Sequence, residues 1–315
     1  MTELTRLDCA DWLLERDRFL LLTHRKPDGD TVGSAAGLCR GLRSLGKTAH
    51  VLYNPEITPL YAPLLEGLTK DEPEEGDILV AVDVAADTMF PRAYDSLKNS
   101  IDLRIDHHGS GREYTPRELV ESDSAACAEI IWELLLDMGV EPDQQMAEAI
   151  YVGVSTDTGC FRFANTTAHT FDVAGDCAAV GADIYNWNQK LFDTKSLPKL
   201  RLQGWIIDHV QFLEDGKLAI CCLPKAVEEQ IGVTEDDMND ISSFLRSIEG
   251  VRMSALLRET EEGRIKISVR AIPGSNAAAV CEAFGGGGHA GAAGCNLRMT
   301  MTEAAEAIGK VMLSY

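Results

Sequence analysis

Short apolar runs that alternate with helical patterns constrain the first half of this chain more than any other feature. The apolar runs of strand length are residues 19–24, 48–53, 77–83 and 101–106. Helical patterns are found at residues 31–45, 124–138, 143–154 and 167–180. This alternation is typical of a parallel sheet, because parallel neighbours need a long crossover connection between them. We therefore expect an α/β fold with a parallel sheet in the N-terminal half.

The pattern changes after Gly181. Residues 184–210 form one helical stretch without strand signals, and two pairs of apolar runs follow it. The pair at 212–223 surrounds an Asp-Gly turn, and the pair at 252–270 surrounds a turn at 261–263, so each predicts a β-hairpin. We expect three parts, with the active site in the cleft between the two domains. They are a parallel α/β domain at 1–185, a helical linker at 186–210 and a smaller α+β domain at 211–315.

Composition excludes several classes of function. The chain has 315 residues, of which 45% are hydrophobic and 25% charged, which is typical of a globular protein. Its 29 Lys and Arg against 50 Asp and Glu leave a net charge of −21, so a broad basic face for long nucleic acid or anionic membranes is not expected. No apolar run approaches the ~20 residues of a membrane span. No signal-peptide pattern is present, and nine cysteines without CxxC spacing indicate reduced thiols in the cytoplasm.

Polar side chains of the metal-binding kinds follow three of the predicted strands. In open α/β sheets, ligands bind outside the carboxyl ends of the strands, so these side chains are the first candidates for a site. Each has a structural explanation by itself, such as a turn at Asp28, a helix cap at Asp83 or an Asx turn at Asp157. Packing does not explain why they all stand at strand ends or beside glycines. The candidates are His24, Asp28, Asp30, Asp83, Asp106, His107, His108 and, in an expected loop at 153–159, Asp157.

These donor types indicate a particular chemistry. Carboxylates and imidazoles without a thiolate suit Mn²⁺, with Mg²⁺, Co²⁺ or Zn²⁺ as alternatives. The number of ligands exceeds what one ion requires, so we expect a two-metal centre with one bridging carboxylate. Such a centre activates a shared water for in-line attack at phosphorus. The reaction class that follows is hydrolysis of phosphoesters.

A glycine-rich tract marks the second domain. Residues 285–288 are four glycines, followed by His289. The spacing formally matches a dinucleotide-binding fingerprint, but a helical pattern precedes it and a strand pattern at 296–299 follows it, which reverses the required order. The alternatives left are a flexible linker and an anion cradle made of backbone N–H groups with His289. We favour the cradle, because the tract lies inside apolar sequence.

Taken in order, these motifs resemble those of the DHH phosphoesterases. The first domain offers His24-x-x-x-Asp28-x-Asp30, Asp83, Asp106-His107-His108 and Thr156-Asp157. The second offers Ser268-Val-Arg270 and the tract from Gly285 to Gly294, which resemble the DHH-associated C-terminal domain. The most similar subgroup comprises two-domain enzymes that act as nano-RNases and as phosphatases of pAp, an adenosine bisphosphate.

The resemblance implies a role for each candidate residue. His24, Asp28 and Asp83 would hold one Mn²⁺, and Mg²⁺ or Co²⁺ could substitute for it. The ligands of a second ion would be Asp30, Asp83, His107 and Asp157. The catalytic residues would be Asp83, Asp106 and His108. His108 would face the scissile phosphate or leaving group, and Asp106 would orient a histidine. Substrate would be held by Arg270, Asn276, Gly286, Gly287, Gly288 and His289.

The expected function is therefore a Mn²⁺-dependent exonuclease-type hydrolase of very short RNA or linear dinucleotides, which also dephosphorylates pAp. One alternative is an inorganic pyrophosphatase with the same first-domain motifs, although such enzymes lack the glycine tract. The other is a non-catalytic nucleotide-binding or RNA-binding module, which should have lost metal ligands. The partners are thus small nucleotides, not long nucleic acid or membranes. A homodimer is left open, because Trp132 and residues 134–136 suit an interface as well as a core.

Overall fold

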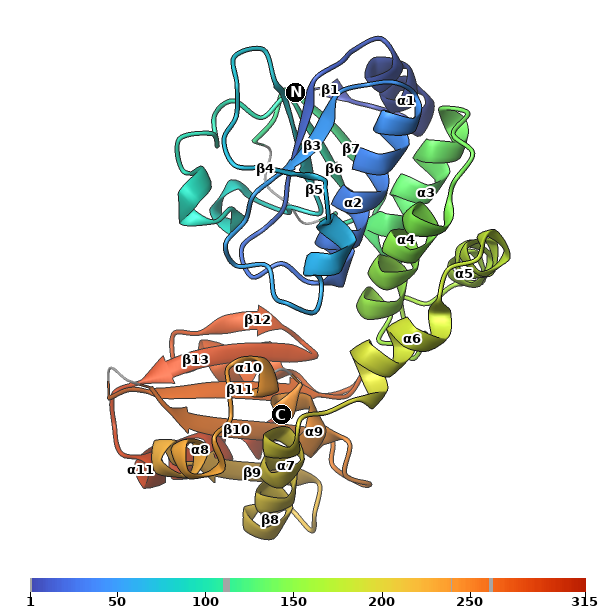
Figure 1. Ribbon diagram of the computed structural model, residues 1–315. Helices are drawn as coiled ribbons and strands as arrows, with labels where there is room; N and C mark the ends of the chain where they lie inside the picture. Colours follow the sequence, from blue (N-terminus) through green and yellow to red (C-terminus); the bar gives the residue numbers. More distant parts are fainter. Residues whose placement is uncertain (1, 110–113, 239, 261–262) are drawn as a thin grey trace. The chain divides into compact units, whose positions relative to one another are not determined.

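The computed structural model describes residues 2–109, 114–238, 240–260 and 263–315. The chain divides into two compact units, Met1–Thr194 and Lys195–Tyr315 (Figure 1). The division falls within the helical segment expected at 184–210. That segment consists of α6 (Ile184–Asn188) and a π-helical turn (Gln189–Asp193) in the first unit, and α7 (Leu197–His209) in the second.

A parallel sheet organises the first unit, as the strand–helix alternation predicts. Among the described residues it has seven strands in the order β1-β7-β6-β5-β2-β3-β4, and every neighbouring pair is parallel. The short strands β1, β4 and β7 carry too little apolar sequence to be predicted. The strands are β1 (Thr2–Glu3), β2 (Phe19–Leu22), β3 (Ala49–Leu52), β4 (Thr69–Lys70), β5 (Ile78–Val82), β6 (Leu103–Asp106) and β7 (Arg117–Val120).

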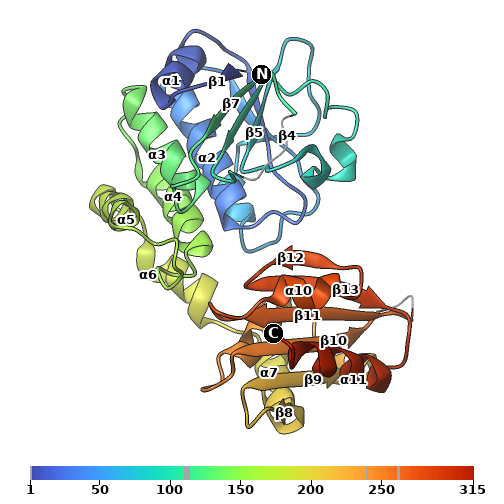
Figure 2. The ribbon, with the colours of Figure 1, turned by 180° about the vertical axis from the view of Figure 1, so that it is seen from behind.

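The two faces of this sheet are covered differently. Alternate side chains of β2 point to opposite faces, so Phe19 and Leu21 enter one core while Leu20 and Leu22 enter another. Short 3₁₀ turns between residues 87 and 94 cover the second face, and Figure 2 shows this segment in teal, away from α2. The first face is covered by α1 (Arg6–Leu14), α2 (Gly29–Ser44), α3 (Cys127–Asp137) and α4 (Gln144–Asp157).

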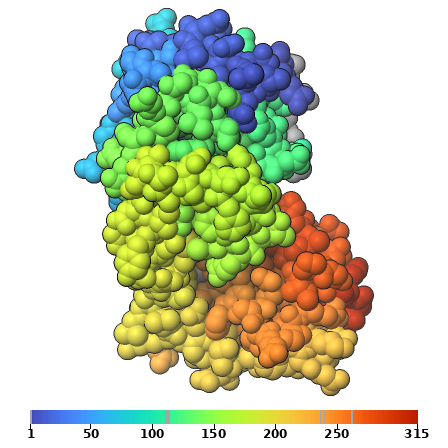
Figure 3. All heavy atoms as spheres, turned by 90° about the vertical axis from the view of Figure 1, so that its right-hand side faces the viewer, coloured from blue at the N-terminus to red at the C-terminus, as the bar shows by residue number. Residues whose placement is uncertain are grey.

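The outer surface of this helical layer is green in Figure 3, beside α5 (Ala168–Val180) and α6 in yellow-green. Trp132 and Leu134 are buried in the core of the first unit. Of the side chains considered for an interface, only Leu136 is largely exposed, at 43%. Of the two alternatives left open for this stretch, core and interface, the structure places most of its apolar side chains in the core.

Helices α2 and α4 pack unusually closely. Glycines recur every fourth residue along α2, at positions 29, 33, 37 and 41, which places them on one side of the helix. A Cβ added at Gly33 would lie 2.2 Å from the backbone oxygen of Ala149 on α4. Only glycine allows this approach. It brings the first turn of α2 beside the last turn of α4, where Asp30 and Asp157 lie.

The second unit is a six-stranded mixed sheet among the described residues, in the order β12-β13-β11-β10-β9-β8. Both predicted hairpins are confirmed as antiparallel pairs, β8 with β9 and β10 with β11. Residues 261–262 of the expected second turn lie outside the described residues. The strands are β8 (Gln211–Leu213), β9 (Leu218–Leu223), β10 (Met253–Glu259), β11 (Ile265–Ala271), β12 (Gly287–His289) and β13 (Ala292–Leu297).

Helices cover both faces of this second sheet. The strand expected at 296–299 is wrong in its bounds, because β13 begins at Ala292 and pairs with Gly287–His289 as β12. The glycine tract is thus part of an ordered hairpin and not a flexible linker. One face carries α10 (Ala277–Glu282) and α11 (Met301–Met312), and the other carries α7, α8 (Lys225–Ile231) and α9 (Ile241–Arg246). No helix in the described parts of the chain is both long and apolar enough to cross a membrane.

The glycine contact between α2 and α4 predicts a position-specific cost. Gly33→Ala should lower the free energy of unfolding by about 2 kcal/mol, because the new methyl group meets backbone that cannot move aside. Gly175→Ala on α5 is the matched control, since nothing lies within 4 Å of its added Cβ. It should be neutral or stabilise the protein by up to about 1 kcal/mol. Urea unfolding measures both, and equal effects of the two substitutions would contradict close packing at Gly33.

Candidate metal centre

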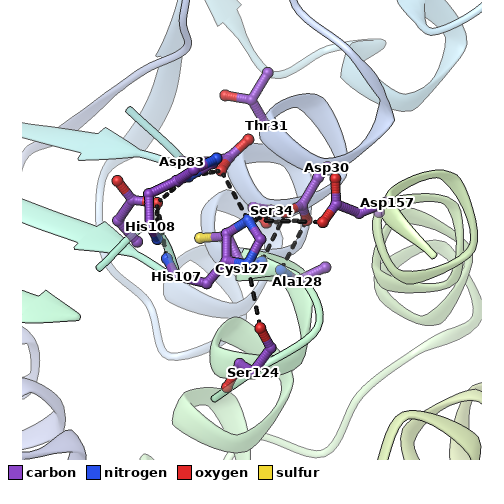
Figure 4. Close-up of polar contacts among 12 residues, drawn as sticks. Asp30, Thr31, Ser34, Asp83, His107, His108, Ser124, Cys127, Ala128 and Asp157 are labelled. Atoms are coloured by element: carbon purple, nitrogen blue, oxygen red, sulfur yellow. Dashed lines mark hydrogen bonds and ion pairs between the residues drawn. The ribbon is translucent and has the colours of Figure 1, made fainter. Parts of the chain in front are cut away.

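The predicted site residues of the first unit lie together at one edge of the parallel sheet. From β2 the chain moves to β3 on one side and later to β5 on the other, so the carboxyl ends of β2 and β5 flank a topological switch point. The loops after β2 and β5 and the end of β6 supply the candidates, and α4 ends beside them (Figure 4). The rule that ligands bind outside the carboxyl ends of parallel strands therefore predicts where these residues come together.

Asp83 is buried between two groups of these residues. It follows β5 directly and has a left-handed backbone, with φ of 58°, which few residues other than glycine, asparagine and aspartate adopt. Its Oδ2 lies 3.6 Å from Nε2 of His24, and its Oδ1 lies 3.7 Å from Nε2 of His107. The two oxygens of one carboxylate thus face two different imidazoles.

His24 and Asp28 form the first group with Asp83. The Nδ1 atom of His24 lies 2.8 Å from the Arg25 carbonyl oxygen, to which it can donate, and this leaves Nε2 free to act as a ligand. Nε2 lies 3.5 Å from Oδ1 of Asp28. Asp28 also caps α2, since the same Oδ1 accepts hydrogen bonds from the backbone N–H groups of Asp30 and Thr31. The helix-cap explanation and the ligand explanation of Asp28 are therefore compatible.

Asp30 is the most deeply buried member of the second group. Its Oδ2 accepts a hydrogen bond of 2.7 Å from the backbone N–H of Cys127, and its Oδ1 accepts one of 2.9 Å from Ala128. These N–H groups belong to the first turn of α3, whose N-cap residue Ala126 has no side-chain oxygen. Asp30 therefore caps α3 from a position 97 residues away in the sequence.

His107 and Asp157 complete the second group. Nε2 of His107 lies 3.8 Å from Oδ2 of Asp30 and 3.7 Å from Oδ2 of Asp157, while its Nδ1 lies 3.2 Å from the carbonyl oxygen of Ser124. The expectation of a loop around Asp157 is wrong, because α4 continues through this residue. Helix α4 packs against the side of α2 that carries the glycines. This contact stabilises about one more helical turn than the sequence pattern predicts.

The donor set fits divalent cations. Within the described ranges, three sets of residues bring ligand atoms within 4.8 Å of one another: His24, Asp28 and Asp83; Asp30, His107 and Asp157; and Asp83, Asp106, His107 and His108. The first two are the ligand groups described above. Among the described residues, Asp83 Oδ1 and His107 Nε2 are buried polar atoms without a hydrogen-bond partner. Such atoms are costly to bury unless something binds them. A cation is the partner that carboxylate and imidazole lone pairs can share.

The electrostatics of the site indicate the same partner. Burial, reinforced by the charge of Asp83, holds the pKa of Asp30 well above its ordinary value. Burial is also the main cause that raises the pKa of Asp157 to about 6. Burial disfavours the charged form of His24, but hydrogen bonds to Asp28 and Asp83 outweigh this effect and raise its pKa to about 10. The metal-free site therefore keeps protons that a bound cation would replace.

Asp106 and His108 form a third group with Asp83 and His107, and Nδ1 of His108 lies 3.4 Å from Oδ1 of Asp83. Oδ1 of Asp106 lies 2.8 Å from Nδ1 of His108 and accepts hydrogen bonds from the backbone N–H groups of His107 and His108. Both oxygens of Asp106 are occupied, since Oδ2 accepts two hydrogen bonds from Arg104. Asp106 thus orients a histidine. The His108 side chain is 42% exposed, and its hydrogen bond to Asp106 is the main cause that raises its pKa to about 10.

The second unit brings two of its predicted residues to one face of its sheet. Arg270 on β11 is paired with Ala292 on β13, which is paired with His289 on β12. Directly paired residues project to the same face, so Arg270 and His289 flank the small Ala292 side chain. The side chain of Asn276 instead caps α10 by accepting from the N–H of Ala279. Gly286 approaches β13 too closely for a side chain, and Gly287 and Gly288 lie in β12.

Two buried polar residues near the site are absent from the sequence-based candidates. Asn54 follows β3, is 1% exposed and donates to the backbone oxygen of His24 at 3.0 Å. The strand-end rule applied to 48–53 would have found it. Arg104 lies within β6 and is 2% exposed. An arginine between two apolar residues of a predicted buried strand was the available signal.

Comparisons with known proteins agree with these motifs. The family model described as the DHH family, N-terminal domain, matches residues 18–154, and the DHHA1 domain model matches residues 215–314. A Thermus thermophilus protein named bifunctional oligoribonuclease and PAP phosphatase NrnA is 34% identical, over 88% of this chain and 83% of its own length. The chain belongs to the DHH family. The resemblance inferred from the motifs is thereby confirmed.

Two further relatives also match most of the chain. A Bacillus subtilis protein of the same name is 28% identical, over 89% of this chain and 90% of its own length. A solved structure described as an exopolyphosphatase-related protein from Bacteroides fragilis has a TM-score of 0.89 and 25% identity, and the match covers 98% of this chain and 96% of the other. The names of these relatives agree with the expected reaction class, hydrolysis at phosphorus.

The geometry of the centre predicts pH-dependent metal binding. Mn²⁺ should raise the Tm of the protein, and its affinity should fall by at least tenfold between pH 7 and pH 5, because ligands with raised pKa values must lose protons before they bind. Isothermal titration calorimetry in two buffers measures the affinity and the protons released. Asp157→Asn should weaken binding and reduce the proton release. Asp172→Asn on the exposed surface of α5 is the matched control, and equal behaviour of the two variants would refute this site.

Proposed function

We propose that this protein is a Mn²⁺-dependent phosphoesterase with a two-metal centre, which releases nucleoside monophosphates from very short oligoribonucleotides or linear dinucleotides and dephosphorylates pAp. The observation that carries the proposal is the arrangement of two ligand groups around the two oxygens of Asp83. The activities in the names of the Thermus and Bacillus relatives supply the substrate class. All nine cysteines are free thiols, which is consistent with a cytoplasmic protein.

Each ligand group would hold one ion. The first consists of His24, Asp28 and Asp83, and the second of Asp30, Asp83, His107 and Asp157. Divalent cations held by these residues would supply the acidity that turns a bound water into a nucleophile, and would offset the charge of the phosphate under attack. The orientation of the two imidazoles suits metal binding. The Arg25 carbonyl oxygen lies at Nδ1 of His24, and the Ser124 carbonyl oxygen lies at Nδ1 of His107, so Nε2 of each ring is available as a ligand.

His108 would act on the leaving group. Its Nδ1 is held by Asp106, so Nε2 is the atom that can donate to an oxygen of the substrate. The carboxylate of Asp106 favours the protonated ring, as the aspartate of a catalytic triad stabilises an imidazolium. A proton donor at this place suits a substrate whose leaving oxygen is a ribose hydroxyl, because an alkoxide leaves poorly without a proton.

The second unit would bind the part of the substrate that does not react. Arg270 and His289 project from one face of its sheet on either side of the small Ala292 side chain, and a phosphate group could bind between them. Asn276, whose Oδ1 caps α10, has its amide N–H₂ group left for a substrate oxygen. One arginine and one histidine can hold a phosphate or two but not a long strand, which also agrees with the net charge of −21.

Turnover of small substrates tests this function. Purified protein with Mn²⁺ should hydrolyse RNA of two to five nucleotides and pAp, and should act far more slowly on an RNA of 30 nucleotides. Asp83→Asn should lower kcat by at least about a thousandfold, since it removes the charge shared by both ligand groups. Asp172→Asn should leave kcat unchanged.

Other outcomes would replace the proposal. Full turnover by Asp83→Asn or Asp157→Asn would exclude the metal mechanism. Hydrolysis of inorganic pyrophosphate in place of the nucleotides would favour a pyrophosphatase. Binding of these nucleotides without any hydrolysis, over a range of divalent metals, would favour a sensor or binding module.

A further inference from the structure

We infer that Arg104 is a positioning residue for the proton donor His108, acting through the carboxylate of Asp106. The inference rests on the proposed function, because it gives Arg104 a place in the same hydrolysis. It assigns a role to a buried cation that belongs to neither ligand group of the metal centre.

Arg104 is bound to Asp106 through a paired contact. Its Nε and Nη2 atoms lie 2.9 Å and 2.6 Å from the same oxygen, Oδ2 of Asp106. Arg104 is 2% exposed and Asp106 is fully buried. Charge-assisted hydrogen bonds from a planar guanidinium fix a carboxylate in orientation as well as in place. Rotation of the Asp106 carboxylate would therefore break two hydrogen bonds at once.

The fixed carboxylate in turn fixes His108. With Oδ2 occupied by Arg104, Oδ1 is left for Nδ1 of His108 and for the backbone N–H groups of His107 and His108. Arg104 Nη2 also donates to the carbonyl oxygen of His108 at 3.1 Å. Arg104 thus contacts the turn both through Asp106 and directly. The His108 ring, whose Nδ1 also lies 3.4 Å from Oδ1 of Asp83, is therefore held in one orientation.

Arg104 is itself held on its other sides. It is paired with Glu118 on β7, whose Oε2 lies 3.3 Å from Nη1, and its guanidinium lies 5.8 Å from the centre of the Tyr114 ring. The Tyr114 hydroxyl donates to the backbone oxygen of Val84 at 2.7 Å, next to Asp83. Packing alone does not require such a group, because apolar side chains often replace a buried ion pair without loss of stability. A positioning role explains why this strand buries an arginine.

The reaction step that depends on this geometry is the departure of the leaving group. Water forms a new bond to phosphorus, the bond from phosphorus to the leaving oxygen breaks, and the Nε2 proton of His108 moves to that oxygen. A proton from the attacking water replaces the one that His108 has given. A leaving group that needs no proton, such as nitrophenolate, should therefore be insensitive to the orientation of His108.

The experiment compares two substrates of the holoenzyme, a diadenosine dinucleotide with a ribose leaving group and a nitrophenyl ester of adenosine monophosphate. Arg104→Lys should lower kcat on the dinucleotide at least about tenfold with little change in KM, and lower kcat on the nitrophenyl ester less than threefold. Glu118→Gln is the matched control, because it removes the other carboxylate partner of Arg104 and leaves Asp106 untouched. It should behave as wild type on both substrates.

A second variant guards against loss of folding. Arg104→Met leaves Asp106 as a buried, unpaired charge, so it is combined with Asp106→Asn, which removes that charge. If Arg104 acts through Asp106, the double variant should show the same ratio of activities on the two substrates as Asp106→Asn alone. Additive losses in this double-mutant cycle would overturn the inference.

A spectroscopic measurement separates this inference from the proposed function. In the metal-free protein, the Nδ1–H of His108 should give a protected, downfield proton resonance in NMR spectra, which Arg104→Lys weakens and Glu118→Gln preserves. An unchanged resonance in Arg104→Lys, or equal losses on both substrates, would overturn the positioning role. Absence of hydrolysis by the wild-type holoenzyme would instead refute the proposed function, and the resonance would still test Arg104.

Discussion

Repulsion among aspartates that share a buried space is the constraint on which the rest of the first unit depends. Asp30, Asp83 and Asp157 all face the imidazole of His107. Burial, together with the negative charge of neighbouring aspartates, raises the pKa of Asp30 and of Asp157. Carboxylates so placed separate unless surrounding structure holds them. The first turn of α3 holds Asp30 with two backbone N–H groups, and the positive end of that helix partly offsets its charge.

The packing of the helices follows from this requirement. Asp157 can face His107 only if α4 ends at the sheet edge, and the close approach of α4 to α2 at Gly33 brings it there. Asp106 is held in another way, because the guanidinium of Arg104 donates two hydrogen bonds to one of its oxygens. The same edge of the sheet therefore keeps two kinds of carboxylate, one open to cations and one already paired. This difference distinguishes the candidate ligands from Asp106, whose oxygens are already occupied by Arg104 and the His107–His108 turn.

The parts of the fold that sequence predicts are those set by local pattern. The loops after β2 and β5 and the end of β6 were predicted to carry His24, Asp83 and Asp106, because parallel strands end at one edge and polar residues there interrupt apolar runs. Contacts between distant segments were not predictable in this way. The cap that Asp30 places on α3 and the extension of α4 to Asp157 each depend on a partner far along the chain, and Arg104 depends on Glu118 of the neighbouring strand, 14 residues away. The hairpin of the glycine tract depends likewise on cross-strand pairing.

The distance in sequence between Asp30 and its partners on α3 also sets an order for folding. A chain that has formed only β2, α2 and β5 contains His24, Asp28 and Asp83, the whole of the first ligand group. Asp30 then has no helix to cap, since Cys127 and Ala128 lie 97 and 98 residues from it. The second ligand group becomes complete only when α4 has docked and supplies Asp157. During synthesis, the residues of the first candidate group are therefore all present in the chain before the second group is complete.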